Sequence, residues 1–324
     1  MVNLGIELKN LTPPLDIIYF VISYLSYQLP PPTKIIFMNF KIVKTLAITI
    51  FMVVNTNLAL AAESETITKS MTFHYDKYLE SQYSKKVAVI NWDSKEGIER
   101  LERTPFKGDF YRLAHHFKPQ PNPAACGQAA ATVVLSAIYE LNNKSFPVIE
   151  EWPITIGDKK YPLQYRLFNE GNFFNSETDK VLDRRVISMK ITKQDGTFGG
   201  GLDIDELQKM LKIHGVKSKL VNVDKYSDEN LSDFRNLVKE IVNSNKEFLI
   251  LNYDHSYKSL MGGHFSPVVA YDEKSDSVLM LDVAAHRNPW IWINLSDVYH
   301  AMNTKNYAQT AYRGYLVLNT KLSK

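Results

Sequence analysis

One thiol, one histidine and one aspartate in this sequence are of the types that together carry out nucleophilic catalysis. Cys126 is the single cysteine among 324 residues and lies in the stretch PQPNPAACGQAAATVVLSAIYE. His264 follows two glycines in GGHFSP, and Asp282 interrupts the apolar run VLMLDVA. A thiolate that is activated by an imidazole, itself held by a carboxylate, can attack an amide carbonyl. The three residue types therefore indicate a cysteine nucleophile with a histidine base and an aspartate that orients it.

The residues around Cys126 predict a helix over residues 123–142. Asn122 is expected to be the N-cap and Pro123 the first helical residue, which places the thiol in the first turn. The partial positive charge at a helix N-terminus favours a thiolate there. Apolar residues follow at the spacing of one buried helical stripe, at Ala130, Val133, Val134, Ala137 and Leu141. The alternative is that Cys126 is a small buried core residue.

The segment from GGHFSP to LDVA predicts two antiparallel strands, residues 264–272 and 277–284, joined by a turn centred near Lys274. In that register His264 lies opposite the neighbourhood of Asp282, so the two side chains can meet. Gly262 and Gly263 leave room for a ligand or another backbone. Taken singly, His264 could be a hydrogen-bonded strand histidine and Asp282 a strand-end carboxylate.

A donor for the oxyanion would complete such a site. Gln120 lies six residues before the thiol and could place its side-chain amide beside the backbone N–H of Cys126. The alternative is a surface glutamine. A cysteine at a helix start, followed far downstream by histidine and aspartate, is the chain order of papain-like enzymes.

The elements that must position these groups are mixed in type. Helices are expected over residues 204–214, with Asp203 and Glu206 as a capping box, and over residues 230–243. Strands are expected at residues 247–254 and 313–319, and residues 143–201 are expected to be a long irregular region. Helices followed by an antiparallel sheet predict an α+β fold, with the cysteine helix packed against the sheet.

Composition limits the classes of function. The chain is 45% hydrophobic and 23% charged, with a formal net charge of +3, so it is an ordinary globular protein without a basic field for nucleic acid. A single cysteine excludes intramolecular disulfides and cysteine-rich metal sites. The histidines other than His264, including the adjacent His115 and His116, are interpreted as structural or surface residues. A metal site at this pair stays open but has no support in the sequence, and no metal ligand is assigned.

The amino-terminal part does not resemble a folded domain. Residues 38–61 have two lysines, an apolar run and an Ala-Leu-Ala end, the order of a secretory signal peptide with cleavage after Ala61. Residues 1–37 are interpreted as a non-native upstream extension, and residues 62–324 as a single catalytic domain. The expected location is periplasmic or secreted, without stable membrane insertion after cleavage.

Several sequence blocks resemble the phytochelatin synthases, particularly the short bacterial forms. The blocks QPNPAACG, GGHFSP, LDVA, VYHAMNT and YRGYLVL occur in the family's order across residues 84–318. The resemblance implies a papain-like fold and a γ-glutamylcysteine dipeptidyl transferase that acts on glutathione. It matches Cys126, His264 and Asp282 to the family triad and Gln120 to its oxyanion glutamine.

The resemblance also implies further substrate contacts and two departures. Arg313 matches a family arginine that could clamp a substrate carboxylate, although an ordinary salt bridge is equally compatible, and Gly263 would line the substrate site. The family's DV(A/S)R is DVAA here, at Ala284 and Ala285, and the given sequence has no Cys-rich region after Asp282. We therefore expect mainly hydrolysis of glutathione, with weak transpeptidation.

The resemblance implies no required cofactor. Cadmium or zinc could take part as glutathione thiolates, because soft cations prefer sulfur ligands. Glutathione is the expected partner, and a homodimer is compatible with the sequence. Two other interpretations stay open: a secreted papain-like peptidase for other peptides, and a non-catalytic periplasmic binding module.

Overall fold

The computed structural model describes residues 87–187, 200–255, 262–306, 308 and 310–323. All of them belong to the second of the two units into which the chain divides, residues 76–324. The predicted upstream extension and signal peptide lie outside the described residues and stay predictions. Within the described ranges, no helix combines the length and the apolar character needed to cross a membrane.

A seven-stranded sheet forms the centre of the fold, and every neighbouring pair of strands is antiparallel. In spatial order the strands are β1 (Val89–Asn91), β8 (Ile291–Asn294), β7 (Ser277–Met280), β6 (Gly263–Asp272), β5 (Glu247–Asp254), β9 (Gly314–Leu322) and β4 (Val216–Asn222). Along β5, Phe248 and Ile250 belong to one hydrophobic cluster, whereas Leu249 and Leu251 belong to a second. Because strand side chains alternate between faces, both faces of the sheet are buried.

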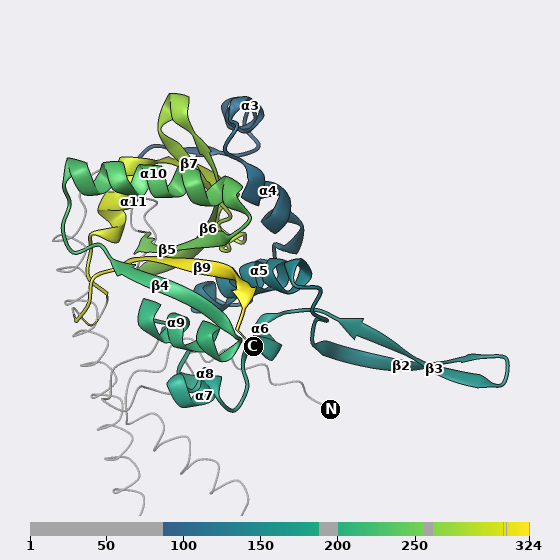
Figure 1. The fold of residues 1–324 in the computed structure, drawn as a ribbon. Coiled ribbons are helices and arrows are strands. Elements are labelled where there is room, and N and C mark those ends of the chain that lie inside the picture. The colour runs from purple at the N-terminus through teal and green to yellow at the C-terminus, as the bar shows by residue number, and fades with distance from the viewer. Residues whose placement is uncertain (1–86, 188–199, 256–261, 307, 309, 324) are drawn as a thin grey trace, which may run out of the picture. The chain divides into compact units, whose positions relative to one another are not determined.

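Helices cover each face (Figure 1). The first cluster contains α5 (Cys126–Leu141) and α9 (Ile204–Ile213), and the second contains α10 (Asp228–Ser244) and α11 (Leu295–Met302). Two further helices, α3 (Lys95–Arg103) and α4 (Gly108–Leu113), precede the short 3-10 helix η1 (Ala114–His116). The predicted α+β fold, with the cysteine helix packed against an antiparallel sheet, is confirmed.

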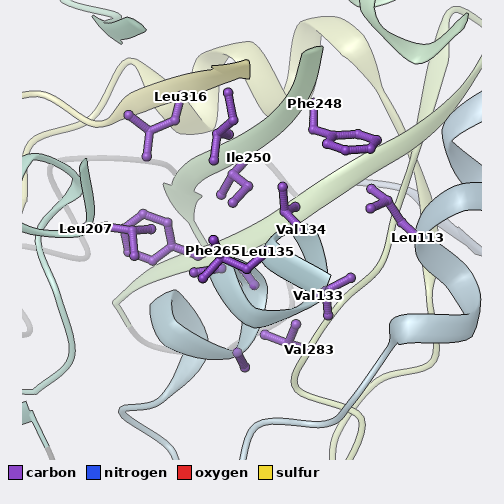
Figure 2. Packing of buried hydrophobic residues seen from close by; sticks show 14 of the residues in the cluster. Leu113, Val133, Val134, Leu135, Leu207, Phe248, Ile250, Phe265, Val283 and Leu316 are labelled. Carbon is purple, nitrogen blue, oxygen red and sulfur yellow. The ribbon is translucent and has the colours of Figure 1, made fainter. Parts of the chain in front are cut away.

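Helix α5 is more deeply buried than an amphipathic stripe requires. Every residue from Cys126 to Tyr139 is buried, because the sheet lies on one side and α4, α6 (Glu170–Phe173) and α9 lie on others. Figure 2 shows Val133 and Val134 of this helix among side chains of the sheet, including Phe265. A helix that is enclosed on all sides is expected to have apolar residues on all sides, and the sequence of α5 is accordingly rich in alanine and valine.

The start of α5 differs from the prediction. The helix begins at Cys126, its N-cap is Ala125, and no side chain caps it. The side chain of Asn122 instead accepts a hydrogen bond from the N–H of Ala124, and its carbonyl accepts one from Ala125. These contacts turn residues 122–125 before the helix, so Asn122 is not the N-cap. The thiol is therefore on the first helical residue.

The predicted hairpin has the expected register but a shorter second strand. Val268 pairs with Met280 and Asp272 with Ser277, around the 3-10 turn η3 (Glu273–Ser275). Strand β7 ends at Met280 and not at Ala284, because the N–H of Asp282 turns back to the carbonyl of Met280. Asp282 therefore lies on a turn just beyond the sheet.

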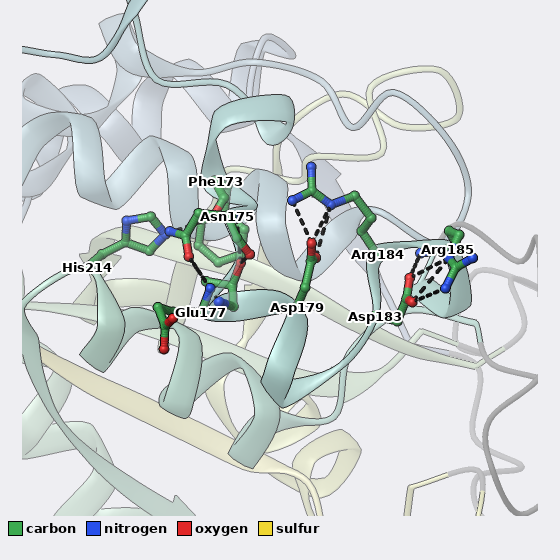
Figure 3. A network of polar contacts seen from close by, with 9 residues as sticks. Phe173, Asn175, Glu177, Asp179, Asp183, Arg184, Arg185 and His214 are labelled. Atoms are coloured by element: carbon green, nitrogen blue, oxygen red, sulfur yellow. Dashed lines mark hydrogen bonds and ion pairs between the residues drawn. The ribbon is translucent and has the colours of Figure 1, made fainter.

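The prediction of a long irregular region over residues 143–201 is wrong in its described part. It contains an exposed two-stranded sheet, β2 (Val148–Ile156) with β3 (Lys159–Arg166), which projects from the rest in Figure 1. Three one-turn helices follow, α6 (Glu170–Phe173), α7 (Thr178–Val181) and α8 (Arg184–Ile187). Polar contacts hold them, including Asp179 with Arg184 and His214 with the carbonyl of Phe173 (Figure 3). Local side-chain bonds of this kind leave no hydrophobic period in the sequence.

The other predicted elements are found within a few residues of their expected ends. Helix α9 begins after Asp203, whose side chain forms a capping box with Glu206. Helix α10 begins two residues earlier than expected, because Ser227 is its N-cap and accepts from the N–H of Asn230. Strand β5 has the predicted bounds.

Replacing Phe265 by alanine is expected to destabilise the fold by about 3–5 kcal/mol, the range for truncating a fully buried aromatic ring. Phe265 is 1% exposed, and its side chain packs from β6 against the first turn of α5. Urea unfolding of the full chain measures the free energy. The matched control is Ile156→Ala in the hairpin, where the side chain is 67% exposed and a change within about 0.5 kcal/mol is expected. Equal losses in both variants would contradict this assignment of the core.

Candidate active site

The thiol of Cys126 is positioned by close contact between α5 and β6. A side chain at Gly127 would place its Cβ 3.3 Å from Leu202 and 3.4 Å from Phe265, so glycine lets the helix start lie tightly against β6. Cys126 is 6% exposed. The backbone N–H groups of this first turn have no intrahelical acceptors, and their partial positive charge surrounds the sulfur.

His264 stands between the thiol and the carboxylate. It is the second residue of β6, and its Nε2 lies 2.8 Å from Oδ1 of Asp282. The thiol of Cys126 also interacts with the imidazole and helps to raise its pKa. With Nε2 directed to the carboxylate, Nδ1 is the nitrogen that remains for the sulfur. The structure thus brings together the three residues that the sequence singled out, although Cys126 and His264 are 138 positions apart in the chain.

The carboxylate of Asp282 is fully buried and has several partners. Oδ1 also accepts from the N–H of Ala284 at 2.9 Å, and Oδ2 accepts from Nδ2 of Asn288 at 3.3 Å. Nε2 of His255 lies 3.4 Å from Oδ2. Burial alone would raise the pKa of Asp282, but the two histidines outweigh burial and hold the pKa well below its usual range. The group is a carboxylate anion at neutral pH.

The imidazole of His264 is correspondingly basic. Burial lowers its pKa, but the charge and hydrogen bond of Asp282, followed by the contacts with Cys126, raise the pKa to about 10. At neutral pH the ring is therefore an imidazolium beside a carboxylate on one side and sulfur on the other. Such a group can stabilise a thiolate and can later donate a proton.

Gln120 lies in the loop between η1 and α5 and is 8% exposed, so it is not a surface glutamine. Its backbone N–H donates to the carbonyl of Val283 at 2.8 Å, which ties this loop to the segment that carries Asp282. Its side-chain Nε2 donates to the carbonyl of Asn122 at 2.8 Å. An amide nitrogen has two hydrogens, so this contact leaves one for another acceptor. Oε1 is buried and has no hydrogen-bond partner among the described residues.

Comparisons with known proteins identify the family of this chain. The family model described as phytochelatin synthase matches residues 81–315, which is more than half of the chain. The chain belongs to the phytochelatin synthase family.

Curated relatives of this family member are plant and yeast proteins. It is 30% identical over 236 residues to glutathione gamma-glutamylcysteinyltransferase 3 of Lotus japonicus, across 71% of this chain and 42% of that protein. It is 27% identical over 236 residues to glutathione gamma-glutamylcysteinyltransferase 1 of Arabidopsis thaliana, with the same two coverages. It is 26% identical over 233 residues to the Schizosaccharomyces pombe protein, across 71% of this chain and 48% of that one. The chain therefore matches less than half the length of these relatives.

Arg313 and Gly263 are neighbours in this phytochelatin synthase family member. A Cβ at Gly263 would lie 2.9 Å from Nε of Arg313, so the space left by glycine is filled by the guanidinium. Arg313 is 2% exposed, and its NH1 donates to Oγ1 of Thr304 at 2.7 Å and to the carbonyl of Lys305. NH1 also lies 3.7 Å from the buried carboxylate of Asp254. The arginine thus lies beside the residue before His264, and the predicted substrate contacts of Arg313 and Gly263 stay predictions.

His255 was missed by sequence reasoning, which grouped it with the structural and surface histidines. Its ring stacks on that of His264, with centroids 4.2 Å apart and planes 5° from parallel, and it is 4% exposed. The two predicted strands contained a signal for this contact, but only once they are paired with each other. Pairing β5 with β6 joins Asp254 to Gly263, which brings the next residue, His255, alongside the start of β6. Without a pairing for these two strands, the sequence alone did not make that contact visible.

Replacing His255 by phenylalanine is expected to keep the stacked ring but remove one partner of the buried carboxylate. A buried acceptor that loses a partner costs about 1–3 kcal/mol, so the free energy of unfolding should fall by that amount. The apparent pKa of Asp282 should rise, since His255 helps to lower it. Urea unfolding and the pH dependence of stability measure both effects. The control is His286→Phe, at an exposed position; equal behaviour of the two variants would contradict a positioning role for His255.

Proposed function

We propose that this protein cleaves the Cys–Gly amide bond of glutathione, with Cys126 as the nucleophile. The observation that carries the proposal is the chain of contacts from the thiol of Cys126 through His264 to the buried carboxylate of Asp282. Family membership and the names of the relatives, all glutathione gamma-glutamylcysteinyltransferases, support this substrate class.

The first half of the reaction forms an acyl-enzyme. The thiolate of Cys126 attacks the amide carbonyl, and negative charge develops on the carbonyl oxygen. The C–N bond then breaks, the imidazolium of His264 donates its proton to the departing glycine amine, and a γ-glutamylcysteinyl thioester remains on the sulfur. The carboxylate of Asp282 keeps the ring oriented and stabilises its positive charge throughout.

We assign two donors in this part of the fold to the oxyanion. One is the backbone N–H of Cys126, which lies at the helix N-terminus. The other is the amide of Gln120, which the hydrogen bond to Val283 holds beside the Asp282 segment. Preorganised donors of this kind contribute about 3–4 kcal/mol each to acyl transfer.

The thioester is resolved by an acceptor. Neutral His264 takes a proton from water, and hydrolysis releases γ-glutamylcysteine; attack by the amine of a second glutathione lengthens the peptide instead. We propose that hydrolysis predominates, because Ala285 is exposed three residues after Asp282 where the family pattern has arginine. Without that cation, an anionic acceptor peptide has one charge fewer to bind. Cadmium or zinc would enter as glutathione thiolates.

The test is incubation of the full chain with reduced glutathione, with and without Cd²⁺ or Zn²⁺, followed by mass spectrometry. Glycine and γ-glutamylcysteine are the expected main products, with little longer peptide, and Cys126→Ala should form neither. Longer peptides as the main product would overturn the hydrolytic preference. Cleavage of unrelated peptides but not glutathione would favour the peptidase interpretation. A thiol that no alkylating agent labels would favour the binding module.

A further inference from the structure

A group of side chains of the types that bind metals lies at the opposite end of α5 from the thiol. His115 and His116 are the last two residues of η1, and Glu140 lies in the final turn of α5. Glu140 is fourteen positions after Cys126 along the helix, a rise of about 21 Å. The group is therefore distinct from the proposed active site and does not depend on the proposed function.

The two histidines converge on one carboxylate oxygen. Nε2 of His115 lies 3.1 Å, and Nε2 of His116 2.8 Å, from Oε2 of Glu140. The two rings contact each other, with centroids 3.8 Å apart. All three potential ligand atoms lie within 4.8 Å of one another. Adjacent residues in a helical turn normally diverge, so this convergence is a specific feature of the turn.

We propose that His115, His116 and Glu140 bind a divalent ion of the zinc class, with water completing the coordination. Zinc bonds imidazole nitrogen and carboxylate oxygen at about 2.0–2.2 Å, which places tetrahedral ligands about 3.3 Å from one another. The observed N–O separations of 3.1 and 2.8 Å are within about 0.5 Å of that spacing. Two imidazoles and one carboxylate form the ligand set of open zinc sites.

The site combines one fixed ligand with two accessible ones. The side chain of His116 is 12% exposed and packs edge-on against Phe146, with centroids 6.2 Å apart. The side chains of His115 and Glu140 are 54% and 59% exposed. An ion can therefore enter from solvent and keep a water ligand, while His116 holds the position of the site.

The helix end itself also favours a cation. The last turn of α5 carries partial negative charge from its free carbonyls, contains the acidic Glu140 and has no basic residue. A bound divalent ion would neutralise both sources of negative charge. It would also join η1 to the end of α5, the two ends of the segment that contains Gln120 and Cys126.

Calorimetric titration of the full chain with Zn²⁺ tests the proposal. Cys126→Ala is the parent, since it removes the thiol as a competing ligand. Adding His116→Ala or Glu140→Gln is expected to weaken one zinc site at least about tenfold, a loss that even changes around ligands can cause. Adding His286→Ala, at an exposed position, is the matched control and should leave affinity unchanged.

Thermal unfolding provides a second readout. Zinc should raise the melting temperature of the parent and of the His286→Ala control, because an ion that binds the folded state stabilises it. It should not raise that of Glu140→Gln, whose exposed side chain makes misfolding of this variant unexpected. Absence of zinc binding by the parent, or equal affinities in all variants, would overturn the proposal. So would a loss of binding on adding His255→Phe in place of His116→Ala, because His255, His264 and Asp282 are the other group of potential ligands among the described residues.

Discussion

Replacing Cys126 by alanine is expected to reduce glycine release from glutathione by a factor on the order of 10⁴ or more, since a nucleophile acts as one unit with its base. The imidazolium of His264 would remain beside the carboxylate of Asp282, but it would have no sulfur to activate. Water cannot replace the thiolate efficiently, because the thioester step is lost. The measurement is the initial rate of glycine formation by mass spectrometry.

This variant should keep its fold. Cys126 is 6% exposed and is followed by a run of small residues, and alanine differs from cysteine by one sulfur atom. Urea unfolding should therefore give a free energy within about 1 kcal/mol of the parent chain. Phe265→Ala is the matched control with the opposite expectation. This variant should be less stable than the parent chain but should keep the thiol. Glycine release by folded Cys126→Ala at the parent rate would remove Cys126 from the mechanism.

Asp282→Asn is expected to lower the rate by about 10³–10⁴, the scale seen when a carboxylate that orients a catalytic histidine becomes an amide. Among the groups that raise the pKa of His264, to about 10, Asp282 has the largest effect. Without the carboxylate, burial dominates and the pKa of His264 should fall. The proton-donating form would then be lost at neutral pH, and the remaining activity should increase as pH is lowered.

The pH dependence of stability gives an independent measurement of the same pair. His264 binds its proton more tightly in the folded chain, so its contribution to stability is complete below the unfolded pKa of about 6.5. That contribution is lost as pH rises toward the folded pKa of about 10. Urea unfolding across this range should show the loss in the parent chain and a much weaker dependence in Asp282→Asn.

Asn288→Ala is the matched control for this second prediction. It removes the 3.3 Å hydrogen bond from Nδ2 to Oδ2 of Asp282 but leaves the carboxylate and its charge in place. A loss of about 1 kcal/mol in stability and a modest loss of rate are expected, with the pH profile unchanged. If Asn288→Ala and Asp282→Asn had the same pH profile, the charge of Asp282 would not be what raises the pKa of His264.

Much of the fold was predictable where the local sequence shows the composition of a strand or the cap of a helix. The β-typical composition of β5 and the capping box of Asp203 with Glu206 are local signals, and both elements are found at their expected places. The start of α5 was not predictable, because Asn122 is a good N-cap by type but is used in a preceding turn. The β2–β3 hairpin has exposed residues on both faces and therefore lacks a buried period.

The sequence by itself determined which chemistry is available, since residue types and their order along the chain are properties of the sequence. It has one thiol, a histidine after two glycines and an aspartate in an apolar run, and the turn near Lys274 is short enough for local register to pair the last two. The tertiary structure alone decided contacts between distant segments. The stacking of His255 on His264, the filling of the space at Gly263 by Arg313 and the convergence of His115 and His116 on Glu140 depend on how separate elements pack. Contacts between such distant elements leave no periodic pattern in the sequence of either segment.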